Sequence, residues 1–304
     1  MPETKLFEEL TVRSRDGYAL SAHVFGCENP KAVILFIHGM EEHQDRYTYF
    51  AAFLKENGYA VVTADMRGHG KNAPKLSHIA DRNGAGLLIE DEKALLGMIW
   101  ERFPRTQVYL HGRSMGSIIA RKLMQTHSGA FEKVILEGYP NPQAAAKAGL
   151  ALAGCLAVLK GKDGHSALID RMVTGSFSAS VKDAETPCDW LSADRENVEK
   201  YTADPLCGVP FTLGSYEALF RLLDDIGSPA KYRDVHADMP ILLIAGENDP
   251  CTGGEKGRAD SLDRLKRAGF RNIRVETLPG MRHEILNEKD RDSVYRKILS
   301  FLDE

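Results

Sequence analysis

Short, unbroken runs of apolar residues constrain the fold of this chain more than any other feature. β-Branched residues dominate most of the runs, which lie at residues 32–37, 60–64, 108–110, 134–136, 241–245 and 273–278. Unbroken rather than alternating runs predict strands buried on both faces, as in a parallel sheet. Stretches with helical spacing separate them, at residues 47–57, 87–103, 115–126 and 254–268, with a last helix at 289–301. This alternation predicts a mostly parallel, doubly wound α/β sheet.

Two segments depart from the alternation. Residues 11–25 read as a hairpin, because Asp16-Gly17 separates two strand-like runs. Residues 139–233 contain no clear parallel-strand run, begin with Tyr139-Pro140-Asn141-Pro142 and are rich in turn residues. We predict a helical lid insertion at 139–233 between two parts of an α/β core, at 1–138 and 234–304. The 304 residues are enough for one large domain that carries such an insertion.

One motif points to nucleophilic chemistry. Residues 112–116 read Gly-Arg-Ser-Met-Gly, directly between an apolar strand and a helix with apolar periodicity. Glycines at both ends permit the tight turn that exposes a serine hydroxyl above a sheet. The N-terminus of the following helix favours the negative charge that develops there. We therefore predict Ser114 as the nucleophile, against the alternative of a tight turn with a surface serine.

A serine nucleophile needs two backbone N–H groups that bind the oxyanion of the tetrahedral intermediate. One is expected from the residue after the nucleophile, Met115. The other is expected from the loop after an earlier strand, where His38-Gly39-Met40 follows the run at 32–37. We predict Met40 as this second donor, and His38 as a packed polar residue rather than a catalytic one.

The remaining members of a catalytic triad follow later strands. Asp249 comes just past the run at 241–245, where open α/β sheets place functional groups, and Pro250 defines the turn. Glu247 is the competing acid, two residues earlier. His283 follows the last strand, so the chain order is Ser114, Asp249, His283, which is the order of the serine hydrolases built on this kind of sheet. We predict His283 as the general base and Asp249 as the acid that orients it.

Together these motifs resemble the α/β-hydrolase superfamily and, more narrowly, the bacterial lysophospholipase and monoacylglycerol lipase group, also named serine aminopeptidase S33. The resemblance spans residues 18–302. Its motifs are His38-Gly39-Met40, Glu42-His43, Arg46-Tyr47, 65–70, 112–116, 190–192, 204–208, Asp249 and 282–288. It implies a Ser-Asp-His triad, no cofactor, and hydrolysis of carboxylic esters with acyl chains. Two residues depart from the group: Arg113 stands where histidine is usual, and Glu41 where a small residue is common.

Several other groups receive structural interpretations. The segment 65–70 reads as a charged turn that ties loops together, so Asp65, Arg67 and His69 are not predicted to be catalytic. Apolar residues of the insertion are candidates to line an acyl pocket, although each is more simply explained by packing. They are Leu150, Leu152, Leu156, Val158, Leu159, Phe211, Leu213, Tyr216, Leu219 and Phe220.

The resulting function is hydrolysis of single-chain lipid esters through an acyl-enzyme. The alternative is an aminopeptidase, which needs an acidic group in the lid to hold the substrate ammonium. Asp189, Asp194 and Asp204 are the candidates, and nothing singles one out. A non-catalytic ligand-binding protein is disfavoured because all three triad residues are present. Haloalkane dehalogenation is disfavoured because that reaction needs a carboxylate nucleophile at the position that Ser114 occupies.

Composition narrows the possible partners and location. The formal net charge of −4 gives no reason to expect a nucleic-acid partner. No apolar run approaches the ~20 residues of a membrane helix, so at most a transient contact with a membrane surface is expected. The first ten residues do not resemble a signal peptide. Five dispersed cysteines favour free thiols in the cytoplasm. No metal is expected, since a zinc motif at His283-Glu284 would need histidine at Asn287. Oligomeric state is not predicted.

Overall fold

The computed structural model describes residues 6–141, 145–182 and 184–304. Eight strands form one sheet in the order β1-β2-β4-β3-β5-β6-β7-β8. Strands β3 to β8 are parallel to one another, whereas β2 pairs antiparallel with both β1 and β4. The bounds are β1 (Glu8–Arg13), β2 (Ala19–Phe25), β3 (Val33–Ile37), β4 (Ala60–Ala64), β5 (Val108–Arg113), β6 (Lys133–Glu137), β7 (Ile241–Gly246) and β8 (Ile273–Leu278). The predicted hairpin and mostly parallel sheet are confirmed.

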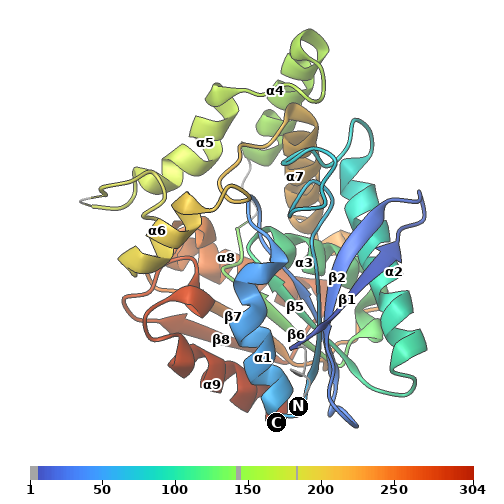
Figure 1. Ribbon diagram of the computed structural model, residues 1–304. Helices are drawn as coiled ribbons and strands as arrows, with labels where there is room; N and C mark the ends of the chain where they lie inside the picture. The colour runs from blue at the N-terminus through green and yellow to red at the C-terminus, as the bar shows by residue number, and fades with distance from the viewer. Residues whose placement is uncertain (1–5, 142–144, 183) are drawn as a thin grey trace.

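Helices cover both faces of the sheet (Figure 1). Helices α1 (Thr48–Glu56) and α9 (Arg291–Asp303) pack with one apolar cluster, and α2 (Gly84–Arg102), α3 (Met115–His127) and α8 (Gly254–Ala268) pack with the other. Short 3₁₀ helices lie at Gln44–Tyr47, Ser128–Ala130, Pro229–Lys231, Pro250–Thr252 and Ile285–Asn287. The doubly wound architecture follows from strands that are apolar on both faces.

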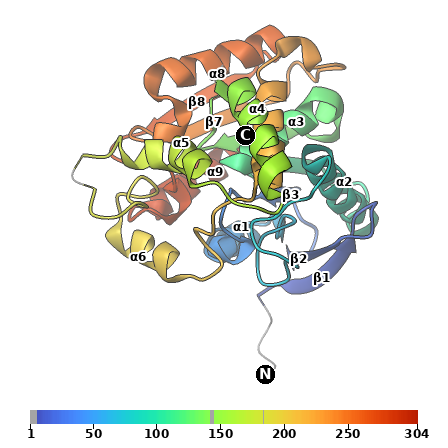
Figure 2. The same cartoon turned by 90° about the horizontal axis from the view of Figure 1, so that it is seen from above.

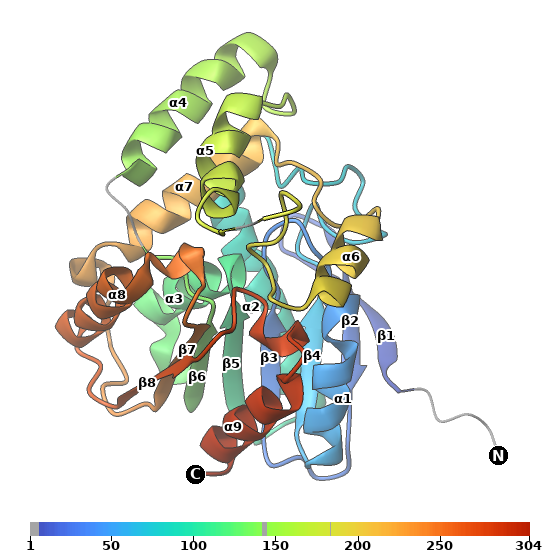
Figure 3. The ribbon, with the colours of Figure 1, turned by 90° about the vertical axis from the view of Figure 1, so that its left-hand side faces the viewer.

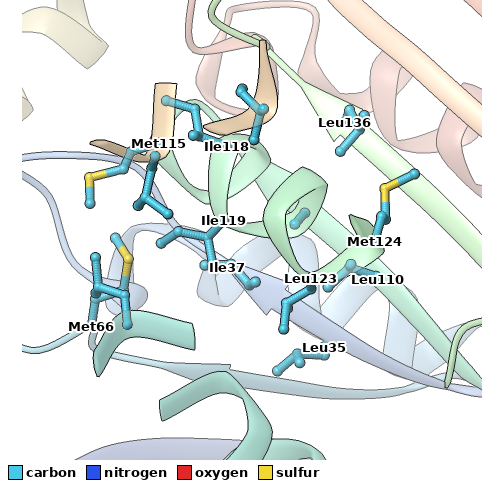
Figure 4. Packing of buried hydrophobic residues seen from close by; sticks show 14 of the residues in the cluster. Leu35, Ile37, Met66, Leu110, Met115, Ile118, Ile119, Leu123, Met124 and Leu136 are labelled. Carbon is cyan, nitrogen blue, oxygen red and sulfur yellow. The ribbon is translucent and has the colours of Figure 1, made fainter. Parts of the chain in front are cut away.

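Helix α3 is held directly against the strands that flank its start. Figure 4 shows Ile118, Ile119 and Leu123 of α3 beside Leu35 and Ile37 of β3. All five side chains are buried, and each such side chain contributes roughly 1.5–3 kcal/mol on removal from water. This packing fixes the N-terminus of α3, and with it the residue that precedes the helix.

The apolar run at 273–278 differs from its expectation. Strand β8 lies at the edge of the sheet, pairs only with β7 and has only Leu278 fully buried, with Val275 40% exposed. The prediction of burial on both faces is wrong for this strand, because an edge position leaves its side chains partly uncovered by helices.

Between β6 and β7 the described chain is helical and contains no strand. The inserted helices are α4 (Ala145–Lys160), α5 (Ala167–Ser178), α6 (Arg195–Ala203) and α7 (Leu213–Ile226). Figures 1 and 3 show α4, α5 and α7 standing above the sheet, at the end away from the C-terminus, and Figure 2 views them from above. The domain boundaries at 139 and 233 stay a prediction. Pro142 of the expected linker lies outside the described residues, as do residues 1–5, 143–144 and 183.

None of the described helices combines the length and the apolar character that crossing a membrane requires. All five cysteines are free thiols.

Candidate active site

Ser114 occupies a strained turn between β5 and α3. Its backbone has φ +52° and ψ −119°, a conformation that non-glycine residues rarely adopt. Close backbone packing holds the turn: a Cβ on Gly112 would lie 2.4 Å from the carbonyl oxygen of Gly116, and one on Gly116 would lie 2.1 Å from that of Ile37. Both glycines are therefore required by close approach, and the turn presents the Ser114 side chain at the carboxyl end of β5.

The structure brings Ser114, His283 and Asp249 into one hydrogen-bonded chain. The Ser114 Oγ lies 2.8 Å from Nε2 of His283, and Nδ1 of His283 lies 2.9 Å from Oδ2 of Asp249. His283 and Asp249 are each 1% exposed, and Ser114 is 8% exposed. This arrangement orients the imidazole so that Nε2 can remove the serine proton.

Asp249, rather than Glu247, is the acid that contacts the imidazole. The second oxygen of Asp249 accepts the backbone N–H of Cys251 at 2.9 Å, which fixes the carboxylate as the cap of the short helix Pro250–Thr252. Glu247 is exposed, and its carboxylate accepts the backbone N–H of Gly280 at 3.3 Å. The turn at Asp249-Pro250 therefore supplies the carboxylate that we predicted at this position from the sequence.

The two residues predicted to donate backbone N–H groups to an oxyanion, Met40 and Met115, lie beside Ser114. Met115 is the first residue of α3, where a helix leaves its N–H groups without partners inside the helix. In the loop after β3, the N–H of Gly39 donates to Glu42 and the N–H of Glu41 donates to Nε2 of His69 at 3.4 Å. Met40 lies between these two engaged donors, and Met40 and Met115 both line the cavity that contains Ser114.

A buried charge network lies directly beneath the nucleophile. Its members are Arg46, Arg113, Glu42, Glu137 and Glu284, all buried except the partly exposed Arg46, whose side chain is 8% exposed. Arg113 donates to Glu42 at 2.6 Å and lies 3.4 Å from Glu284. Arg46 bridges the same two carboxylates, at 2.5 Å from Glu284 and 3.6 Å from Glu42. Two arginines thus face three carboxylates within the interior, and Glu137 also lies 2.9 Å from Nε2 of His111.

Glu42 connects this network to the loop after β3, which contains Gly39 and Met40. Its Oε1 accepts both Arg113 and the backbone N–H of Gly39, and its Oε2 accepts the hydroxyl of Tyr47 at 2.7 Å. Burial alone would raise the pKa of Glu42, but the two arginines outweigh burial and lower it to about 2. A fixed carboxylate therefore holds the loop next to Met40. The sequence showed these residues as parts of motifs, but gave no sign that they meet.

His38 and the charged turn at 65–70 have structural contacts, in keeping with their interpretation. His38 bonds to the carbonyl of Gly39 at 2.8 Å, and its Nε2 accepts the backbone N–H of Met66 at 3.0 Å. Burial lowers the pKa of His38 to about 3, so the ring is neutral. Asp65 accepts the backbone N–H of Gln44 at 2.9 Å. Arg67 forms two 2.6 Å hydrogen bonds to Asp91 and also pairs with Asp16, which ties the first hairpin to α2.

A narrow cavity of about 80 Å³ lies above Ser114. Besides the groups named above, its walls are mostly apolar and come from the inserted helices and their connections: Val173, Phe177, Trp190, Leu191, Leu219 and Leu223. Of the apolar residues expected to form an acyl pocket, Leu219 lines this cavity. Phe211, Leu213, Tyr216 and Phe220 are instead buried in the core, whereas Val158 and Leu159 are 85% and 82% exposed. Packing accounts for the buried members, because helix α7, which carries Leu213, Tyr216 and Phe220, lies against α3 and α4.

The acidic residues considered for ammonium binding are held elsewhere. Asp189 accepts the backbone N–H of Glu185 at 2.7 Å, Asp194 caps helix α6, and Asp204 pairs with His43 at 2.9 Å. None of the three lines the cavity above Ser114. A different acid, Glu41, does line it.

Among the described residues, two groups have ligand atoms close enough to hold a metal ion. They are His43-Asp204-Cys207 and Asp249-Cys251-His283. In each group the histidine is already hydrogen-bonded to the aspartate, at 2.9 Å. These contacts account for the proximity without an ion.

The chain is similar to known proteins over most of its length. The family model for serine aminopeptidase, S33, matches residues 28–290. The chain is 25% identical to a monoacylglycerol lipase of Mycolicibacterium smegmatis over 278 residues, which cover 90% of this chain and 89% of that protein. It is 22% identical to phospholipase YtpA of Bacillus subtilis over 281 residues, covering 91% and 97%.

The chain is also similar to solved structures. A thermostable carboxyl esterase from Bacillus coagulans, crystallised in complex with glycerol, matches with a TM-score of 0.90 and 28% identity over 99% of both chains. These relatives are lipase- and esterase-type hydrolases. By its sequence and its fold, the chain belongs to the serine aminopeptidase S33 family of α/β-hydrolases.

Proposed function

We propose that this protein hydrolyses carboxylic esters of single-chain lipids, such as monoacylglycerols or lysophospholipids, with Ser114 as nucleophile. The observation that carries the proposal is the hydrogen-bonded chain from Ser114 Oγ through His283 to Asp249, at 2.8 and 2.9 Å. The apolar walls of the cavity favour an acyl group, and the names of the relatives favour lipid esters.

The mechanism is a two-step acyl transfer. His283 Nε2 takes the proton of Ser114 as Oγ attacks the ester carbonyl, and the N–H groups of Met40 and Met115 bind the resulting oxyanion. Collapse of the intermediate breaks the bond to the alcohol, which leaves with the proton from His283. Water then attacks the acyl-enzyme with His283 again as base, and the acid is released. Asp249 keeps the ring in the tautomer that both steps need.

Entry of a lipid requires the inserted helices to move as a lid. A cavity of about 80 Å³ is smaller than the ~300–1,000 Å³ of typical ligand pockets. Val173 and Phe177 of α5, with Leu219 and Leu223 of α7, form its roof, so displacement of these helices is the route by which it enlarges.

Contact with a lipid surface has support from the exposed side chains of α4 and α5. Val158 and Leu159 of α4 are more than four-fifths exposed, and Leu168 and Met172 of α5 are more than half exposed. Exposed apolar side chains on the inserted helices suit a transient contact with aggregated substrate.

Steady-state kinetics with a substrate panel test the proposal. We expect kcat/KM for p-nitrophenyl esters to depend on acyl-chain length and to exceed that for aminoacyl anilides. Ser114→Ala should lower kcat by about 10⁴-fold or more, whereas Ser176→Ala, at an exposed serine of α5, should have no effect. Faster turnover of the anilides would favour the aminopeptidase instead.

A further inference from the structure

The Glu41 side chain is a buried acid with one carboxyl oxygen that lacks a partner among the described residues. Glu41 is 8% exposed, and its Oε1 is buried without a hydrogen-bond partner. No salt bridge involves it within the described part of the chain. Buried polar atoms are nearly always paired, so an unpaired carboxyl oxygen calls for an explanation.

The loop needs the backbone of Glu41 but not its carboxyl group. The N–H donates to His69, and the carbonyl accepts the N–H of Gly208 and the hydroxyl of Tyr201, each at 2.9 Å. The φ of +58° is a conformation that glycine adopts more readily. A glycine would satisfy these backbone contacts equally well, so the carboxyl group serves something other than the loop.

Among the residues that the structure describes, no cation without a partner lies near the carboxyl group. The titratable groups around it are Asp170 on α5, Cys188, Tyr201 on α6, Tyr216 on α7 and His69. Arg113, which lines the same cavity, and the nearby Arg46 both pair with Glu42 and Glu284. Burial, reinforced by Asp170, raises the pKa of Glu41 to about 8, against the opposing effect of the Phe211 backbone N–H.

We propose, on the basis of the ester hydrolysis proposed above, that the free oxygen of Glu41 binds a hydroxyl group of the substrate next to the scissile ester. Glu41 and Ser114 line the same cavity, whose other walls are mostly apolar. A hydroxyl group both donates and accepts, so it pairs with a neutral or an ionised carboxyl group. A plain alkyl chain leaves the oxygen unpaired, which is the situation in which a site discriminates most strongly. The preferred substrates are therefore hydroxylated esters.

Matched ester pairs test this subsite on the full-length protein. Hydroxyethyl butyrate against propyl butyrate places the hydroxyl on the alcohol, and propyl β-hydroxybutyrate against propyl isovalerate places it on the acyl chain. Ratios of kcat/KM are measured on the wild type. Ratios of dissociation constants are measured by NMR titration on Ser114→Ala, where turnover does not consume the ester. Glu41→Met removes the polar group, Glu41→Gln keeps a hydrogen-bonding one, and Glu247→Gln is the control outside the cavity.

We expect the hydroxylated ester to be preferred by about tenfold or more in one of the two pairs. Glu41→Met should abolish the preference, while Glu41→Gln and Glu247→Gln should retain it. A ratio near one in both pairs, meaning no preference for the hydroxylated ester, would overturn the subsite even if Ser114-dependent hydrolysis persists. So would a preference that survives in Glu41→Met. A preference in binding without any turnover would uphold the subsite and reject the hydrolase. Tighter binding of alanine propyl ester than of either hydroxylated ester would overturn it in favour of an ammonium ligand.

Discussion

Glu41 and Glu42 are adjacent in the chain and both are buried beside Ser114, yet their surroundings are opposite in charge. Glu42 contacts Arg113 at 2.6 Å and Arg46 at 3.6 Å, and its pKa is lowered to about 2. Burial next to Asp170 raises the pKa of Glu41 to about 8. Burial penalises both carboxylates, so the counterions decide which one stays ionised. The ionised Glu42 holds the loop that contains Met40, whereas Glu41 is the group that we propose to bind a substrate hydroxyl.

The largest effect is expected from removing the central cation of the buried charge network. Arg113→Met leaves Glu42 and Glu284 short of a counterion in the interior, so the free energy of unfolding should fall by about 3–5 kcal/mol. Arg267→Met is the control, because Arg267 is 56% exposed and pairs with Asp263 on the surface; its cost should stay below about 1 kcal/mol. Urea denaturation measures both. A loss of stability in Arg113→Met as small as that in Arg267→Met would show that the network contributes little to the fold.

A smaller effect is expected for the coupling free energy between Glu42 and Arg113. In a double-mutant cycle of Glu42→Gln and Arg113→Met, the double variant should lose less stability than the sum of the single variants, by about 0.5–3 kcal/mol. The reason is that each single variant leaves a buried charge without its partner, whereas the double variant removes both. Strict additivity in the same denaturation assay would mean that the 2.6 Å contact carries no coupling.

The pH dependences of stability that the two neighbouring acids contribute should run in opposite directions. The folded chain keeps the Glu41 proton up to about pH 8, whereas an unfolded glutamate loses it near the ordinary value of 4.5. The wild type should therefore lose stability relative to Glu41→Gln as pH rises from about 4.5 to about 8.

For Glu42 the sign is reversed. Its folded pKa lies below 4.5, so the stability that it contributes is complete above 4.5 and is lost as pH falls towards about 2. The advantage of the wild type over Glu42→Gln should shrink over that acidic range. Melting temperatures across pH check both trends, and parallel curves for the two variants would remove the contrast between the neighbouring acids.

The sequence predicts the sheet and the triad because each rests on local patterns. Five of the six apolar runs are buried strands, and the Gly112–Gly116 turn needs only its own glycines and the strand and helix on either side. The exception, β8, lies at the edge of the sheet, and Arg274 and Glu276 within its run are the residues that indicate this partly solvated position.

The environments of the two acids depend instead on distant side chains. Arg113 and Glu42 are 71 positions apart, and Arg46 and Glu284 are 238 apart. Sequence analysis singled out Arg113 and Glu41 as departures from the family pattern, but their contacts required the fold. The lid acids show the same limit, since Asp204 is engaged by His43 from a loop 161 positions away.

The chemistry at Ser114 is tested most directly by covalent labelling. A fluorophosphonate should add a single adduct to the wild type, and peptide mass spectrometry should locate it on Ser114, with no adduct on Ser114→Ala. An adduct on another residue, or ester hydrolysis at the wild-type rate by Ser114→Ala, would contradict the assignment of the nucleophile.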